Sequence, residues 1–223
     1  MKKLLFIIVM LLLISACDTN GGDKNKKVSG ENNKEVKSEE SEDEKNKGSE
    51  KEKLSNDGDK MYDPEIDGTV ELMGTKEPNE TIDLDPVKLR IHTIKVIRML
   101  NVKDPDFLNY IQEFTDKNTI EFVQILYEIE NTEDINVRLN SPIRAIVLNT
   151  GEQIETFGND LAYDDNYART LYGEVKNESA VSIVIKDSDP KDINEIKIIT
   201  GRIDHGDTAE TLVNEQTITY KLD

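Results

Sequence analysis

Cysteine is almost absent from this sequence, since Cys17 is the single one in 223 residues. One thiol cannot form an intramolecular disulfide, and it cannot supply the set of thiolates that structural zinc sites use. Because Cys17 lies three residues after the first apolar run, no cysteine nucleophile is available in the chain that follows it. The scarcity of cysteine therefore excludes disulfide, thiolate-metal and cysteine-protease chemistry from residues 18–223.

Histidine is also scarce, and the familiar catalytic motifs are missing. His92 and His205 are far apart and lack the flanking ligands of a zinc signature, so we interpret each as an ordinary surface or hydrogen-bonded histidine. No Gly-x-Ser-x-Gly turn, P-loop, dinucleotide-binding glycine pattern or His-Glu-x-x-His motif is present. We therefore predict no catalytic residues and no enzyme, and a hydrolase with an unrecognised site is the remaining enzymatic alternative.

Basic residues are few relative to acidic ones. The net charge is −18, and the 16 basic and 33 acidic residues of segment 61–223 place −17 of it there. Phosphate backbones are bound through clustered lysine and arginine, so nucleic acid is excluded as a partner. A cation, a basic peptide or a basic protein patch remains compatible, and the acidity can equally serve solubility alone.

The N-terminus has the layout of a secretion signal. Lys2 and Lys3 precede an unbroken run of 11 apolar residues, 4–14, which is too short to span a bilayer as a helix. The small residues Ser15 and Ala16 follow, as signal peptidases require. We therefore expect residues 1–16 to be a signal peptide that takes no part in the fold.

The stretch Ile14-Ser15-Ala16-Cys17 resembles the lipobox of bacterial lipoproteins. The resemblance implies cleavage before Cys17 and a thioether link from Cys17 to diacylglycerol, whose two acyl chains suffice for stable anchoring. It predicts a lipid-anchored protein on the extracellular face of the cell membrane. The lack of disulfides and the abundance of lysine and asparagine favour a low-GC Gram-positive source.

Segment 17–60 is predicted to be a disordered, charged linker that carries the lipidated cysteine. Between residues 18 and 60 it contains three large aliphatic residues and no aromatic residue. Such a segment cannot bury enough apolar area to offset the conformational entropy that folding costs. Its expected role is to hold the following domain away from the membrane.

Segment 61–223 is predicted to be an antiparallel β-sandwich of about seven to nine strands. In 120–130 the residues Val123, Ile125, Tyr127 and Ile129 alternate cleanly, whereas 87–100 changes parity midway and so indicates a bulge. Further strands are expected at 70–73, 137–148 with a break at Pro142, 153–157, 175, 180–186, 193–200 and 217–222. The absence of alternating strands and helices excludes a parallel sheet.

One helix is predicted to interrupt the strands, over residues 105–116. Asp104 precedes Pro105, which suits a cap followed by proline at the first helical position. Leu108 and Ile111, and Phe107 and Phe114, then follow at helical spacing. We expect this helix to lie on the sandwich.

The order of strands and turns resembles the uncharacterised immunoglobulin-like domains of Gram-positive lipoproteins. The resemblance rests on EFVQILYEIENTEDINVRL, IVLNTGEQIET and YGEVKNESAVSIVIKDSDPKDINEIKI, in which strands end in Asn-Thr, Gly and Asp-Pro turns. It covers about 87–222 and implies an exported immunoglobulin-like domain without an established activity. The 104–116 helical insertion and the long 157–173 loop depart from the family pattern.

Two polar regions are candidate sites. Asp187, Asp189 and Asp192 are spaced like the oxygen ligands of a calcium loop, although they do not fit an EF-hand and can equally be a solvated acidic turn; Asp160, Asp164 and Asp165 are a second such group. The 157–173 loop carries Tyr163, Tyr167 and Tyr172, which can either form a recognition surface or anchor the loop to the sandwich.

These observations favour a membrane-anchored extracellular lipoprotein with a non-catalytic binding module. Its expected partners are the membrane, through the Cys17 lipid, and an unidentified protein or envelope ligand. A calcium-stabilised or ligand-sensing accessory lipoprotein is the alternative, and a cell-envelope hydrolase a more distant one. No cofactor is expected, apart from calcium if the acidic loop binds it.

Overall fold

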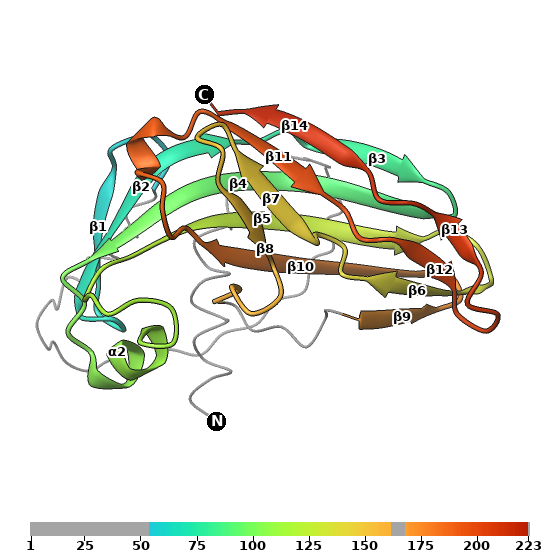
Figure 1. Cartoon of the computed structure of the whole chain (residues 1–223), viewed down its shortest axis with the longest axis horizontal. Coiled ribbons are helices and arrows are strands. Elements are labelled where there is room, and N and C mark those ends of the chain that lie inside the picture. Colours follow the sequence, from blue (N-terminus) through green and yellow to red (C-terminus); the bar gives the residue numbers. More distant parts are fainter. Residues whose placement is uncertain (1–53, 162–167, 223) are drawn as a thin grey trace, which may run out of the picture. The chain divides into compact units, whose positions relative to one another are not determined.

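Antiparallel strands in two layers make up most of residues 54–161 and 168–222, the parts of the chain that this computed structural model describes (Figure 1). The expected all-β antiparallel sandwich with one inserted helix is confirmed. The expected linker, 17–60, lies outside the described residues except for its last seven, which belong to the folded unit. There Leu54 is buried, and the Asp59 carboxylate accepts the backbone N–H groups of Ser55 and Asn56 at 2.9 and 2.7 Å.

The first layer is a six-stranded sheet in the order β1-β2-β4-β5-β10, with β3 paired to β4 beside this path. Every strand pair in it is antiparallel. Its members are β1 (Lys60–Asp63), β2 (Gly68–Lys76), β3 (Glu80–Leu84), β4 (Val87–Leu100), β5 (Ile120–Asn131) and β10 (Val175–Val184).

The second layer consists of two four-stranded sheets, β14-β11-β7-β8 and β13-β12-β6-β9. Three pairs of consecutive strands, β6–β7, β11–β12 and β13–β14, pass from one sheet to the other, so the layer is a single surface bent along one line. Its strands are β6 (Asn136–Asn140), β7 (Ala145–Leu148), β8 (Gln153–Glu155), β9 (Ala168–Tyr172), β11 (Glu195–Ile199), β12 (Ile203–His205), β13 (Thr211–Val213) and β14 (Thr217–Lys221).

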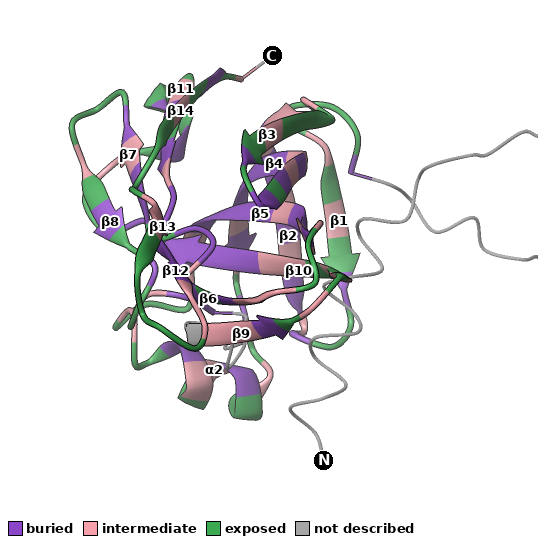
Figure 2. Cartoon of the chain, turned by 90° about the vertical axis from the view of Figure 1, so that its right-hand side faces the viewer, coloured by how far each residue is buried: buried purple, intermediate pink, exposed green. Residues whose placement is uncertain are grey.

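The main core lies between the two layers. The alternating residues predicted for β5, Val123 to Ile129, are all buried in it, together with Ile146 and Ile198 of the second layer. The parity change predicted within β4 is a β-bulge, since the β4–β5 register shifts between Ile91 and Thr93. Figure 2 shows the buried segments of the central strands in purple. Alternation in the sequence therefore predicted which side chains form the core.

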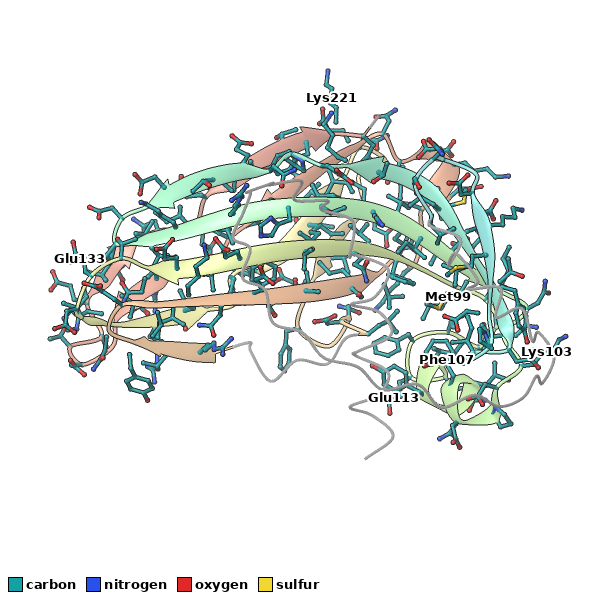
Figure 3. The ribbon with its side chains drawn as sticks, turned by 180° about the vertical axis from the view of Figure 1, so that it is seen from behind. Met99, Lys103, Phe107, Glu113, Glu133 and Lys221 are labelled. Atoms are coloured by element: carbon teal, nitrogen blue, oxygen red, sulfur yellow. The ribbon has the colours of Figure 1, made fainter. Side chains whose placement is uncertain are left out.

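Helix α2 (Pro105–Ile111) begins as predicted and ends earlier than residue 116. The Asp104 carboxylate accepts the N–H of Phe107 at 2.8 Å, and Pro105 occupies the first turn. After Ile111 the chain continues in turns, with the N–H of Phe114 bonded to the Ile111 carbonyl at 2.9 Å. Figure 3 places Phe107 at the same end of the sheet as Met99 of β4. The buried Phe107 and Ile111 anchor the helix to the domain.

The described residues contain more strands than the seven to nine expected. One reason is the bend, which divides three long strands into two ladders each. Another is the short strands β1, β3 and β9, for which the sequence showed no run of alternating apolar residues. Conversely, the two segments expected at 175 and 180–186 form one strand, β10.

Candidate functional site

A cleft of about 370 Å³ opens where the second layer bends. This volume is at the lower end of the range that small-molecule sites occupy. Its residues come from the ends of β6 and β8, from the connections between the two four-stranded sheets and from the segment that follows β8. The lining residues are Asn140, Ser141, Arg144, Glu155, Phe157, Arg202 and Glu215.

Local sequence at the bend forms the floor of this cleft. Ser141 has a φ of 63°, which turns the chain sharply before Pro142, and its hydroxyl donates to the Ile143 carbonyl at 2.8 Å. Across from it, the N–H of Gly201 donates to the Ser141 carbonyl at 2.9 Å. The break at Pro142 expected from the sequence is therefore a bend between β6 and β7. The neighbouring pair, β11 and β12, bends beside it at Gly201.

The cleft carries two half-exposed guanidinium groups in a strongly acidic domain. Arg144 is paired with Glu155 at 3.5 Å and with Glu215, and its side chain is 45% exposed. Arg202 is paired with Asp204 at 2.8 Å, and its side chain is 53% exposed. Each cation thus has a carboxylate partner and still faces solvent with part of its donor set.

Asp204 fixes the position of Arg202 and of Asn140 at one wall of the cleft. The Asn140 side-chain amide donates to Asp204 Oδ2 at 2.9 Å, and Arg202 Nη2 donates to the same oxygen at 3.0 Å. Burial disfavours the ionised form of Asp204, but hydrogen bonds from Arg202, Asn140 and Thr211 outweigh it and lower its pKa. Asp204 therefore stays ionised and orders this wall down to acidic pH.

The chemistry that these groups offer is hydrogen bonding beside an apolar surface. Guanidinium and amide groups donate, carboxylates accept, and the Phe157 ring, 77% exposed, lies at the rim. The Ser141 hydroxyl is bonded to backbone, and the seven lining residues include no imidazole to activate it. The cleft is suited to holding a polar ligand.

Of the three tyrosines proposed as a binding loop, only Tyr172 lies within the described residues. It ends strand β9, pairs with Asn136 of β6, and its side chain is 73% exposed. Tyr163 and Tyr167 lie outside the described residues. Residues 168–172 are therefore an edge strand, which the sequence did not predict, and Tyr172 projects from it.

The acidic turn proposed for calcium is held together by hydrogen bonds and one ion pair. Asp189 Oδ1 accepts the Lys191 N–H at 3.0 Å, which starts the short 3-10 helix η1 (Pro190–Asp192), and it also pairs with Arg98 at 3.3 Å. The Asp187 N–H donates to Glu152 at 3.2 Å. These contacts explain Asp189 as a structural residue, while calcium binding by this turn stays a prediction. In the second group Asp160 is buried, and Asp164 and Asp165 lie outside the described residues.

Cys17 and the expected signal peptide lie outside the described residues. No helix within the described ranges has the length and apolar composition needed to cross a bilayer. His205 of β12 accepts backbone N–H groups of Asp207 and Thr208 at 3.2 and 3.4 Å, as expected for an ordinary hydrogen-bonded histidine. His92 differs from it, because its Nε2 is buried without a hydrogen-bond partner among the described residues.

Sequence reasoning missed the cleft residues Arg144 and Arg202. They are more than 50 residues apart in the chain and meet because two strands bend side by side. The available signals were Pro142 inside an apolar run and the Gly201-Arg202 pair directly after one. Neither signal indicates that the two corners are adjacent.

Comparisons with known proteins show that similar folds occur elsewhere, in proteins without a described function. No family model matches the chain. The chain is 25% identical to the uncharacterized protein YdhF of Bacillus subtilis over 185 residues. This match covers 79% of this chain and 74% of YdhF. A crystal structure of a functionally unknown protein from Listeria monocytogenes is similar in fold, with a TM-score of 0.53 at 8% identity. That likeness covers 71% of this chain and 90% of the Listeria chain.

Proposed function

We propose that this protein is a lipoprotein whose folded domain is a non-catalytic binding module on the extracellular face of the cell membrane. The Cys17 lipid holds the chain on the membrane, and the segment before residue 54 gives the domain reach into the envelope. The observation that carries the binding role is the cleft at the bend, with Arg144 and Arg202 both half exposed. Nucleic acid is not a partner of a domain with this charge.

The ligand class that suits this cleft is a hydroxyl-rich glycan of the envelope. A small anion alone would have to compete with Glu155, Glu215 and Asp204 for the two guanidinium groups. Sugar hydroxyls both donate and accept, so they can bridge an arginine and its carboxylate without breaking the pair. The Phe157 ring at the rim offers the apolar face against which a sugar ring can pack.

The binding role is tested by titrating the full lipidated chain in detergent with soluble fragments of cell-wall glycan and measuring heat. We expect saturable binding, and at least a tenfold loss in the double variant Arg144→Ala, Arg202→Ala. The control is Arg138→Ala on β6, an exposed arginine outside the cleft, which leaves affinity unchanged. Equal binding by the double variant and the native chain would refute the cleft as the site, and the absence of saturable heat with every glycan fragment would refute the ligand class.

The anchoring role has a separate test. Intact-mass spectrometry of the protein from membranes is expected to show a chain that begins at a diacylglyceryl-modified Cys17. The variant Cys17→Ser is expected to leave the membrane fraction. A native chain that retains Met1 or carries an unmodified Cys17 would contradict the anchor and leave the cleft proposal unaffected.

A further inference from the structure

The β-bulge in β4 turns His92 onto the outer face of the six-stranded sheet. Ile91 pairs with Tyr127 and Thr93 pairs with Leu126, so His92 is the extra residue without a partner on β5. Ile91 and Ile94, on either side, both point into the core between the layers. Bulges often re-aim a side chain in this way beside functional sites.

Two glutamates face each other on the same outer surface. Glu128 of β5 and Glu178 of β10 are direct cross-strand partners. Tyr127 and Ile129, which flank Glu128, are core residues, so Glu128 points away from the core, and it is only 9% exposed. Like charges placed directly opposite each other destabilise a sheet unless a cation lies between them.

The three side chains converge. One ligand atom from each of His92, Glu128 and Glu178 lies within 4.8 Å of those of the other two. Among the described residues no other group of three such side chains converges in this way. The buried Nε2 of His92 has no hydrogen-bond partner in the described part of the chain, and a buried imidazole nitrogen without a partner is costly. These features are independent of the cleft, which lies in the second layer.

We propose that His92, Glu128 and Glu178 bind a divalent transition-metal ion of the zinc class. One imidazole nitrogen and two carboxylate oxygens form a donor set that zinc accepts, and three protein ligands leave a fourth position for water or a ligand. Calcium is disfavoured, because it prefers six to eight oxygen ligands and the imidazole offers none. Coordination through Nε2 gives the partnerless nitrogen a bond and places a cation between the paired glutamates.

The site needs only small side-chain movements to close on an ion. With bonds of about 2.1 Å, tetrahedral ligands lie about 3.4 Å apart, so the ligand atoms must move by about 1 Å. Glu178 is exposed and can rotate freely toward the ion. Because the backbone positions come from three hydrogen-bonded strands, the arrangement is held by the sheet and not by a loop.

Two cationic residues, Arg90 and Lys176, are neighbours of Glu128 that an ion has to accommodate. Arg90 is the direct partner of Glu128 on β4. Lys176 Nζ contacts Glu128 Oε1 at 2.8 Å, and its side chain is 55% exposed. The second carboxylate oxygen of Glu128 can bind the metal while this contact persists, or the lysine can swing into water. A salt bridge to such an exposed lysine contributes little, so it is a weak competitor for a coordinated ion.

The test is calorimetric titration of the untagged full chain in detergent with zinc chloride, with imidazole nitrogen NMR on the same sample. We expect one zinc ion per chain, and a zinc-dependent shift in one of the two histidines, His92. Glu178→Gln and His92→Ala are each expected to weaken binding at least tenfold. The matched controls are His205→Ala, the other histidine, and Glu130→Gln, the next acidic side chain on this face of β5, and both keep native affinity.

Several outcomes would overturn the proposal. They are no zinc binding, equal binding in Glu178→Gln, a shift at His205 in place of His92, or displacement of zinc by millimolar calcium. Because Glu178 is exposed, its variant is expected to fold, which circular dichroism checks, so the proposal stays testable even if His92→Ala unfolds. The variants leave the cleft residues intact, so failure here and failure of glycan binding are distinguishable.

Discussion

Gly201 lies so close to the neighbouring strand that a Cβ at this position would be 1.8 Å from the Asn140 carbonyl oxygen. The same added Cβ would lie 2.3 Å from the carbonyl oxygen of Ser141, to which the Gly201 N–H donates. Both obstacles are backbone atoms, which cannot rotate away. Glycine is therefore what allows the two strand corners to pack against each other and form the floor of the cleft.

Gly201→Ala is expected to lower the free energy of unfolding by about 3 kcal/mol, because the strands must separate to admit the methyl group. Urea unfolding followed by circular dichroism measures this change. Gly151→Ala is the control, since its φ of 94° strains an alanine but no atom lies within 4 Å of the added Cβ. It is expected to cost about 1 kcal/mol. A smaller loss in Gly201→Ala than in the control would contradict the close approach.

Arg98 connects the first layer to the 187–192 turn. Its Nε contacts Glu121 at 2.6 Å and its Nη2 contacts Asp189 at 3.3 Å, while its side chain is only 15% exposed. Arg98→Ala leaves the part-buried Glu121 carboxylate and the exposed Asp189 carboxylate without this counter-charge, so we expect a loss of about 2 kcal/mol. Lys60→Ala is the control, because Lys60 pairs with Glu71 at 3.1 Å while 55% exposed. Chemical unfolding should show less than about 0.5 kcal/mol for the control.

Glu152 connects the β7–β8 hairpin to residues 186–188, at the start of the 187–192 turn. Its carboxylate accepts the backbone N–H groups of Lys186, Asp187 and Ser188 at 2.9, 3.2 and 2.8 Å. Burial raises the pKa of Glu152. The hydrogen bonds from the Ser188 side chain and these three N–H groups together lower it by more than burial raises it, so the net shift is downward. Glu152→Gln is expected to cost about 1 kcal/mol at pH 7, measured by urea unfolding.

The pH dependence of that cost follows from the lowered pKa. A carboxyl with a lower pKa in the folded state stabilises the fold above its unfolded pKa, near 4.5, and loses this effect as pH falls through the folded value. The difference in unfolding free energy between the native chain and Glu152→Gln should therefore be constant from pH 7 to about 5.5 and shrink toward pH 3. A difference that grows on acidification would contradict the assignment.

Asp104 caps the N-terminus of α2 through its hydrogen bond to the Phe107 N–H. Asp104→Ala removes that acceptor and is expected to cost about 1 kcal/mol in thermal or urea unfolding. Asp104→Asn keeps a side-chain oxygen at the same position, so it should retain most of the stability. Equal losses in the two variants would indicate that the negative charge, and not the cap, is what matters.

Periodic and local features of the sequence predicted much of this fold. The alternation of Val123 to Ile129 predicted the buried face of β5, because side chains of a strand alternate between faces. The change of parity near Ile91 predicted the bulge, and Asp104-Pro105 predicted the start of α2. The lipobox around Cys17 predicted a lipid anchor, and that prediction awaits its own test. Each of these features depends on residues close together in the chain.

The tertiary structure alone decided which distant residues meet. Arg144 and Arg202 share a cleft because neighbouring strands bend along one line, and His92 reaches Glu128 and Glu178 because the register of three strands aligns them. Register and bend depend on backbone hydrogen bonds between segments tens of residues apart, which no local pattern of side chains specifies. The sequence by itself therefore determined the class of fold and its core, and strand pairing decided where binding chemistry can occur.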